Sequence, residues 1–350
     1  MPLLDDEKLR TITFEIFLRS GLGRAEAITV SNHLIESNLV GHDSHGVIRI
    51  SQYVRSIKNG RINVTAEIDS VHETSTMALL NGNWGFGQVI AERAMNLAIE
   101  KADRSSLACV SVYNCNHIGR LGHYATMAAE RDMVGIISVN NCGAGQVMAP
   151  YGGAAKRLSP NPISIGFPAG KWNTVLLDIS SSVVAEGKVR VKFNEHKNVP
   201  EGWIMDASGR PTTDPADFYN QDGSVVGAIF PFGGTAGYKG FGLGFVLDVL
   251  CGALSTAGCS REGATRVGNA LFVEAIKISD FRPISEFKAE VENLIKYVKS
   301  CPLAPDSSEI LVPGEIEQRE KARRMREGIL VDEATWNSIT EIAQTLGVSI

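Results

Sequence analysis

The sequence has no long apolar run and no excess of positive charge. None of its hydrophobic stretches reaches the ~18 residues that a membrane-spanning helix requires. The opening residues, MPLLDDEKLR, are acidic and amphipathic, unlike a signal peptide. Asp and Glu number 39 against 34 Lys and Arg, and no cluster of basic residues indicates nucleic acid or an anionic membrane. We therefore expect a cytoplasmic protein that binds neither membrane nor nucleic acid.

Cysteine is scarce, and its spacing argues against a zinc site or a disulfide framework. The six cysteines include no CxxC pair and lie far apart in the sequence, whereas zinc ligands usually come in close pairs. We interpret the cysteines as reduced thiols of the core and predict no metal site. They are Cys109, Cys115, Cys142, Cys251, Cys259 and Cys301.

The usual motifs of nucleotide-binding and hydrolytic enzymes are also missing. The stretch GNWGFGQ (82–88) has its glycines in the order GxxGxG instead of GxGxxG, and no acidic residue follows where a Rossmann fold reads the ribose. A tight turn before a helix explains it better. The motifs GxxxxGK[ST], HExxH and GxSxG do not occur.

The patterns that are present predict an α/β protein with mixed sheets. The 350 residues are 44% hydrophobic, enough for a large core and two or three lobes. Two helices are expected over 5–40, broken at SGLG (20–23), and a further helix over 43–58. Strands are expected at 77–82, 107–114, 134–141, 163–168, 174–180 and 270–278, and helices at 87–102, 121–132, 181–193, 237–254, 284–300, 314–328 and 332–346. The helix at 237–254 is expected to be buried.

The two chain ends differ from the middle in being helical. We expect residues 1–75 and 305–350 to pack together as one helical lobe for substrate binding and dimerisation. Residues 76–304 would form the central α/β region that binds a cofactor, with room for two subdomains.

Polar clusters stand at the ends of apolar strands, where ligands bind in open α/β sheets. Seven such clusters are more than helix capping alone explains. They are GHDSHGVIR (41–49), NCNHIGRLGHY (114–124), VNNCGAGQVMAPYGG (139–153), LSPNP (158–162), LDISSS (177–182), GYKGFG (237–242) and VPGEIE (312–317).

These clusters resemble, in order over almost the whole chain, the malate/L-lactate dehydrogenase family, whose fold is not a Rossmann fold. Each match is short, but together they are in register. The matching blocks are DSHGVIR, NHIGRLGHYA, MAPYGG, NPISIGFP, LLDISSSVVAEGKV, VPEGWIMDASGRPTTDP, GYKGFGL and PGE followed by REGILVD. Within the family, HIGRLGHYATMAAE and LVPGEIEQREKARR are most similar to the hydroxycarboxylate dehydrogenase B branch.

The resemblance implies a homodimeric, NAD- or NADP-dependent oxidoreductase with its active site between domains, near the dimer interface. The implied reaction interconverts a 2-oxo acid and its 2-hydroxy acid by hydride transfer. Two alternatives stay open: a reductase of a cyclic imine carboxylate of the piperideine-2-carboxylate type, and a non-catalytic nucleotide-binding homologue. The second alternative is disfavoured because the chain retains the family's polar site residues, which are His45, His117, Arg49 and Lys239.

His45 and Arg49 are the leading site candidates. Hydride addition to a carbonyl creates an alkoxide that a histidine can protonate near neutral pH, and an arginine can clamp a carboxylate through two hydrogen bonds. Four residues apart on one helix, they would face the same side, which suits a 2-oxo acid. The simpler alternatives are a capping histidine and a solvated arginine. The family's proton donor matches His45, and Ser44 either binds substrate or caps the helix.

His117 is the second candidate for the proton donor, because some relatives assign that role to the matching residue. His42 and His123 are interpreted as structural. Asp178 either caps the following helix or lies near the nicotinamide, where a carboxylate would orient a histidine.

The family's cofactor-binding positions match the strand 174–180 and three further places. Lys239 would bind a cofactor phosphate among glycines that allow close approach. The matching residues are Asn141, Thr174, Val175, Leu176, Leu177, Asp178, Ile179, Ser180, Tyr238, Lys239, Gly314, Glu315 and Ile316. The family's GTNP reads SPNP here (159–162), and Pro160 removes one backbone donor from that loop.

Overall fold

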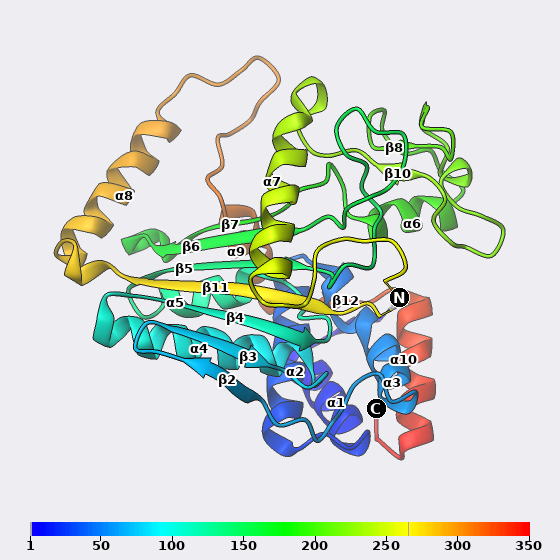
Figure 1. Ribbon diagram of the computed structural model, residues 1–350, viewed down its shortest axis with the longest axis horizontal. Coiled ribbons are helices and arrows are strands. Elements are labelled where there is room, and N and C mark those ends of the chain that lie inside the picture. Colours follow the sequence, from blue (N-terminus) through cyan, green and yellow to red (C-terminus); the bar gives the residue numbers. More distant parts are fainter. Residues whose placement is uncertain (1, 265) are drawn as a thin grey trace.

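The computed structural model describes residues 2–264 and 266–350, and a seven-stranded mixed sheet forms its centre (Figure 1). The strand order is β2-β3-β4-β11-β5-β6-β7, and only β3 and β4 run parallel. The strands are β2 (Asp69–Glu73), β3 (Met77–Asn81), β4 (Leu107–Cys115), β5 (Met133–Asn140), β6 (Pro162–Pro168), β7 (Thr174–Ser180) and β11 (Asn269–Lys277). The predicted α/β class with mixed sheets is confirmed.

Helices cover both faces of this sheet. On one face lie α4 (Gly87–Ser105) and α5 (Gly122–Ala129), packed so closely that a Cβ on Gly135 of β5 would meet Ala128 of α5. On the other face lie α7 (Tyr238–Asp248) and the π-helical turn Val249–Ala253, where Ser138 Oγ of β5 contacts Cys251 Sγ at 3.3 Å. Side chains of residues an odd number of positions apart on a strand point to opposite faces, so Gly135 and Ser138 lie on different faces of β5. The contacts of these two residues therefore place α5 and the π-helical turn on opposite faces of the sheet.

The chain ends pack against each other beside the sheet (Figure 1). The elements are α1 (Asp6–Arg19), α2 (Arg24–Leu39), α3 (Ile50–Lys58) and α10 (Glu333–Leu346), with β1 (Leu3–Leu4) paired antiparallel to β12 (Ile329–Leu330). Asp5 and Asp332 cap α1 and α10 through their carboxylates, and Gly347 ends α10 in a left-handed conformation. The division of the chain into the predicted domains stays a prediction.

Two smaller groups of elements flank the sheet. A three-stranded sheet, β10-β8-β9, and α6 (Glu186–Asn194) enclose their own apolar cluster. Its strands are β8 (Ile204–Met205), β9 (Pro211–Thr212) and β10 (Ala228–Ile229). At the β7 edge, α8 (Ile284–Lys299) leads through a long connection to α9 (Glu315–Glu327), and Leu176 of β7 donates its N–H to Pro313 O at 3.2 Å.

The helix predicted over 43–58 is wrong in its first half. Residues Asp43–His45 and Val47–Arg49 form two 3₁₀ turns, and the α-helix begins only at Ile50. Asn38, 4% exposed at the end of α2, causes this break: its Oδ1 accepts from Val47 N at 2.8 Å and its Nδ2 donates to Asp43 Oδ1 at 2.6 Å. Any side chain on Gly46 would overlap the Asn38 amide, so the turn requires glycine.

Two other expectations about helices need correction. The helix expected over 181–193 begins at Glu186, since Ser180 Oγ accepts from Ser182 N at 3.0 Å and holds a turn there. The helix expected to be buried at 237–254 exposes a large apolar face, with Phe245 54% and Val246 60% exposed. Gly240 and Gly244 are buried and pack closely against Ser181, Phe232 and Met148, and this leaves the large side chains outside.

The cysteines are free thiols in the described chain, but they are not all in the core. Cys115, Cys142 and Cys251 are buried, whereas Cys301 is exposed. Within residues 2–264 and 266–350, no group of three or more His, Cys, Asp or Glu side chains has a metal-binding arrangement. No helix in these same ranges is long and apolar enough to span a membrane.

Replacing Asn38 with Ala should destabilise the turn that carries His45. Val47 N would lose its buried acceptor, at a cost of ~1–3 kcal/mol in the free energy of unfolding. Asn32→Ala, on the exposed face of the same helix, should change it by less than ~0.5 kcal/mol. Urea unfolding of the three proteins measures both; equal losses in the two variants would contradict this account of the turn.

Candidate active site

The strand register brings four of the seven predicted polar clusters to one edge of the sheet. The other three, at 41–49, 237–242 and 312–317, do not follow strands, since they lie after α2 and at the starts of α7 and α9. β3, β4 and β5 end at the edge where β11 begins, since Asn269 pairs with Cys115 and Ala270 with Asn140. β7 ends at the same edge, because Ser180 pairs with Pro162 at the start of β6. The loops at 114–124, 139–153, 158–162 and 180–182 therefore meet there.

Two stacked histidines form the centre of this edge. The rings of His45, in the 3₁₀ turn, and His117, just after β4, lie 5.6 Å apart between centroids with an angle of 17° between planes. Ser44 Oγ lies 3.0 Å from His45 Nδ1, and Arg49 Nε donates to Ser44 O at 2.6 Å. The sequence predicted that His45 and Arg49 share one α-helix, and the structure contradicts this. Arg49 is instead bound to the turn of His45 through the Ser44 carbonyl.

His117 is held by residues that the sequence analysis did not select. Tyr53 OH lies 2.7 Å from His117 Nδ1, and Gln88 Nε2 donates to Tyr53 OH at 2.9 Å. The loop after His117 is fixed at two backbone N–H groups: Ile118 N donates to Asn269 Oδ1 and Arg120 N to His33 Nε2, each at 3.0 Å. Asn269 Nδ2 donates to Asn141 Oδ1 at 3.0 Å, which links Asn141 to this loop.

Both histidines of the stacked pair are neutral at neutral pH. Burial, together with the nearby Arg49 guanidinium, lowers the pKa of His45 to about 3. The same two causes hold the pKa of His117 well below its usual value. Burial likewise lowers the pKa of His33, which accepts a hydrogen bond on Nε2 and so carries its proton on Nδ1.

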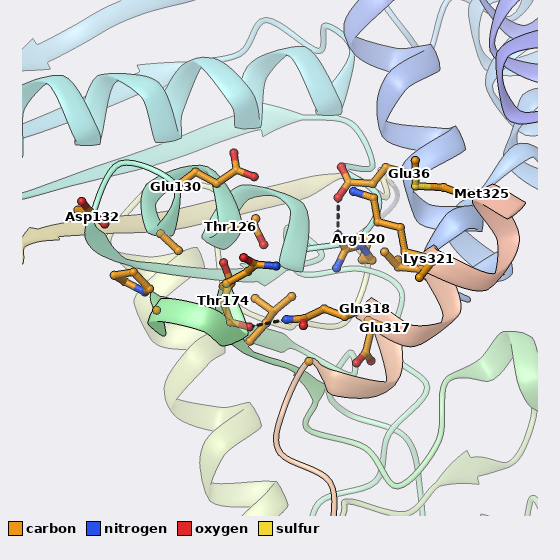
Figure 2. A pocket seen from close by; sticks show the side chains of 18 of the residues that line it. Glu36, Arg120, Thr126, Glu130, Asp132, Thr174, Glu317, Gln318, Lys321 and Met325 are labelled. Atoms are coloured by element: carbon orange, nitrogen blue, oxygen red, sulfur yellow. Dashed lines mark hydrogen bonds and ion pairs between the residues drawn. The ribbon is translucent and has the colours of Figure 1, made fainter. Parts of the chain in front are cut away.

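A cavity of about 620 Å³ lies among α2, α5, β7 and α9 (Figure 2). The predicted cofactor segments meet at its wall, because Thr174, Leu176 and Gly314 all line it. Gln318 Nε2 of α9 donates to Thr174 O at 2.7 Å and closes the junction between the two segments.

Arg120 lines this cavity and has hydrogen-bond donors that no group in the described residues uses. It is 3% exposed, its NH2 pairs with Glu36 Oε1 at 3.2 Å, and its Nε and NH1 have no partner within the described residues. Glu36 also bonds to His123, which supports the structural interpretation of His123. A cavity with a buried cation and free N–H donors fits a ligand rich in oxygen acceptors, such as a dinucleotide.

Asp178 lies next to Arg120 and away from the ring nitrogens of the histidine pair. Its Oδ2 accepts from Gly122 N at 2.7 Å, and a Cβ on Gly122 would touch both Asp178 and Arg120. Burial raises the pKa of Asp178, and the Arg120 guanidinium opposes this. The ring-nitrogen contacts of His45 and His117 go to Ser44 and Tyr53 instead.

The other predicted cofactor residues do not line this cavity. Along β7, Thr174, Leu176 and Asp178 share one face, so Val175, Leu177 and Ile179 face the other; Ser180 Oγ contacts Ser182 Oγ at 2.6 Å. Glu315 is buried, 2.7 Å from Lys299 Nζ, whereas Ile316 is 60% exposed. Tyr238 and Lys239 are exposed in the first turn of α7.

The polar side chains of the SPNP loop are buried within the protein. Asn161 Nδ2 donates to Gly244 O of α7 at 2.9 Å, and both Ser159 and Asn161 are 1% exposed. The segment therefore supports α7, with its polar side chains turned inward.

The comparisons with known proteins agree with this fold. A family model described as malate/L-lactate dehydrogenase matches residues 4–340. The chain is 34% identical to the malate/(S)-sulfolactate dehydrogenase of Methanothermus fervidus over 99% of both chains. It is 33% identical to hydroxycarboxylate dehydrogenase B of Escherichia coli over 98% of this chain and 94% of the relative. The structure of sulfolactate dehydrogenase from Methanocaldococcus jannaschii aligns with a TM-score of 0.88 and 32% identity, covering 99% and 98% of the two chains.

These matches span nearly the full length of each relative, so the protein is an enzyme of the oxidoreductase class. The chain belongs to the malate/L-lactate dehydrogenase family.

Several site residues escaped the sequence analysis for identifiable reasons. Tyr53 lies in the helix expected over 43–58 and, as a mostly apolar side chain, carries no sign of a site there. Gln88 is the last residue of the stretch GNWGFGQ, for which a tight turn was the preferred interpretation. Arg120 lies in the matching block NHIGRLGHYA, but no role was predicted for it. Asn269 carried no local signal, since its contacts with Ile118 and Asn141 arise only from sheet pairing.

The lowered histidine pKa values predict acid sensitivity of the fold. Unfolded histidines take up protons near pH 6.5, whereas folded His45 stays neutral to about pH 3. The unfolded chain therefore binds more protons between these values, and the free energy of unfolding falls as pH falls. In urea unfolding at pH 7, 6 and 5, the free energy of unfolding should fall less steeply with pH for His45→Gln than for the wild type. His72→Gln, at an exposed position in β2, should follow the wild type; an unchanged slope in His45→Gln would contradict the assignment.

Proposed function

We propose that this enzyme interconverts a small 2-oxo acid and its 2-hydroxy acid, with NADH or NADPH as the reductant. The observation that carries the proposal is the neutral, stacked pair of His45 and His117 with Arg49 bound to the same turn. The relatives reported above act, by their names, on malate, sulfolactate and hydroxycarboxylates, which supports this substrate class.

Arg49 holds the substrate carboxylate. Its Nε is used by Ser44 O, and its NH1 donates to Gln52 Oε1 at 2.7 Å. The guanidinium is thereby fixed, and its remaining N–H groups form the flat two-donor edge that matches a carboxylate. The carbonyl at C2 of the substrate then lies one bond from the bound carboxylate, on the side of the histidine pair.

His45 delivers the proton to the C2 oxygen. Arg49 is the second cause of its lowered pKa, and a bound carboxylate offsets that positive charge. Substrate binding therefore raises the pKa of His45 and favours the protonated ring that the reaction needs. The balanced reaction is 2-oxo acid, reduced cofactor and one proton to 2-hydroxy acid and oxidised cofactor. His117 is the second candidate for this proton transfer.

The cavity beside β7 holds the cofactor, which when bound supplies the hydride. Within the proposal, Thr174 and Leu176 of the strand 174–180 and Gly314 of the segment 314–316 line it. Asp178 with Arg120 offers paired acceptor and donor groups. Asn141 contacts the cofactor near the histidine loop, and Lys239 binds a phosphate. The chemistry of the cavity suits both NAD and NADP.

The enzyme acts as a homodimer in the cytoplasm. The exposed apolar face of α7, with Phe245, Val246 and Val249, supports a second copy as its cover. The helical lobe formed by both chain ends binds substrate, and the central region binds the cofactor.

Arg49→Ala should lower kcat/KM for 2-oxo acids by about 100-fold or more, since losing one partner of a charged hydrogen-bonded pair costs ~2–5 kcal/mol. His45→Ala should lower kcat by about 10²–10⁴-fold. Loss of reduced-nicotinamide absorbance measures both, with NADH and NADPH tested separately against pyruvate, oxaloacetate, 2-oxoglutarate, phenylpyruvate, sulfopyruvate and piperideine-2-carboxylate.

Arg55→Ala, an exposed arginine on α3, is the matched control and should keep wild-type kinetics. Turnover of the imine alone would replace the 2-oxo acid assignment. Cofactor binding without turnover of any compound in the panel would overturn the proposal.

A further inference from the structure

A buried row of polar atoms runs from His117 away from the site. Tyr53 is 2% exposed, and among the described residues its hydroxyl has two hydrogen-bond partners, His117 Nδ1 at 2.7 Å and Gln88 Nε2 at 2.9 Å. Gln88 is fully buried, and its Oε1 has no hydrogen-bond partner in the described chain. Phe17 and Phe86 pack edge-on or tilted around the Tyr53 ring and hold it in place.

The donors in this row determine the position of each hydrogen. An amide nitrogen can only donate, so Tyr53 oxygen accepts from Gln88 Nε2. The single hydroxyl hydrogen of Tyr53 then goes to its other neighbour, His117 Nδ1. That nitrogen must be unprotonated, and the neutral ring therefore carries its proton on Nε2. His117 Nε2 has no partner within the described residues and is not enclosed, so it is free to meet a ligand.

The unpartnered Gln88 Oε1 marks a second arrangement of the same row. If the amide turns by 180°, Oε1 accepts from Tyr53, and Tyr53 oxygen then accepts from a protonated His117 Nδ1. In that state Nε2 is free to take up a proton. The hydrogen bonds among His117, Tyr53 and Gln88 can therefore run in either of two directions. Gln88 Oε1 has no donor in the first arrangement and accepts from Tyr53 in the second.

We propose that Gln88 and Tyr53 are positioning residues that decide which nitrogen of His117 carries the proton. In the resting enzyme they present Nε2–H to the C2 oxygen of the substrate, an orientation that rests on the proposed function. Rotation of the Gln88 amide presents Nε2 as an acceptor for the hydroxyl of the 2-hydroxy acid in the reverse direction. His45 remains the proton donor, and His117 supports the oxygen on which the charge develops.

The test reads the tautomer directly. Protein labelled with ¹⁵N-histidine is examined by long-range ¹H–¹⁵N correlation, and the His117 signals are identified by their loss in His117→Asn. The wild type should show the Nε2–H tautomer alone. Tyr53→Phe and Gln88→Met keep the volume but remove the directing groups, and both should show a mixture of the two tautomers. Tyr113→Phe, on β4, should leave the signals unchanged.

Kinetics distinguish this role from simple packing. For reduction of the 2-oxo acid, Tyr53→Phe and Gln88→Met should each have a kcat about 10-fold lower than the wild type and an unchanged KM for the cofactor. An Nδ1–H tautomer in the wild type, or a single unchanged tautomer in both variants, would overturn the inference. The tautomer is read without substrate, so its loss in the variants would uphold the inference even if no 2-oxo acid were turned over, a result that would overturn only the proposed function.

Discussion

The pairing of β11 between β4 and β5 is the constraint on which the site depends. β4 ends at Cys115 and β5 begins at Met133, yet these two strands do not pair; a strand from 269–277 separates them, antiparallel to both. Antiparallel insertion places the start of β11 beside the ends of its neighbours. Asn269 is the first residue of that strand, and its side chain bonds to Ile118 N on one side and Asn141 on the other. One strand therefore sets the distance between two loops of the site.

The turn that carries His45 depends on a different set of contacts, supplied by both chain ends. Asn38 closes the turn from α2, and Arg324 of α9 donates to Asn38 O at 2.8 Å and pairs with Asp43 at 2.6 Å. A short 3₁₀ segment has few internal hydrogen bonds of its own, so these outside partners hold it. This explains why irregular backbone, and not an α-helix, presents the histidine and the arginine.

The regular elements and the active edge could be predicted from sequence, because apolar periodicity and capping residues are local signals. The last helix, expected over 332–346, begins after the cap Asp332 and ends at Gly347, and the polar clusters after strands do meet at one edge. The partners of His117 could not be predicted, since Tyr53 lies 64 residues from it and Gln88 lies 35 residues from Tyr53. The helix expected at 43–49 fails because Asn38 offers its backbone a better acceptor, and α7 was expected to be buried because apolar content alone does not show that glycines occupy its inner face.

The late position of β11 in the chain has a consequence for synthesis. When a ribosome has made the first 260 residues, both histidines and Arg49 already exist, but β4 and β5 lack the strand that belongs between them. Arg324, which secures the turn, emerges later still. The nascent chain therefore carries the reactive side chains without the means to align them, and the loops around His117 and Asn141 gain their spacing only when synthesis is nearly finished.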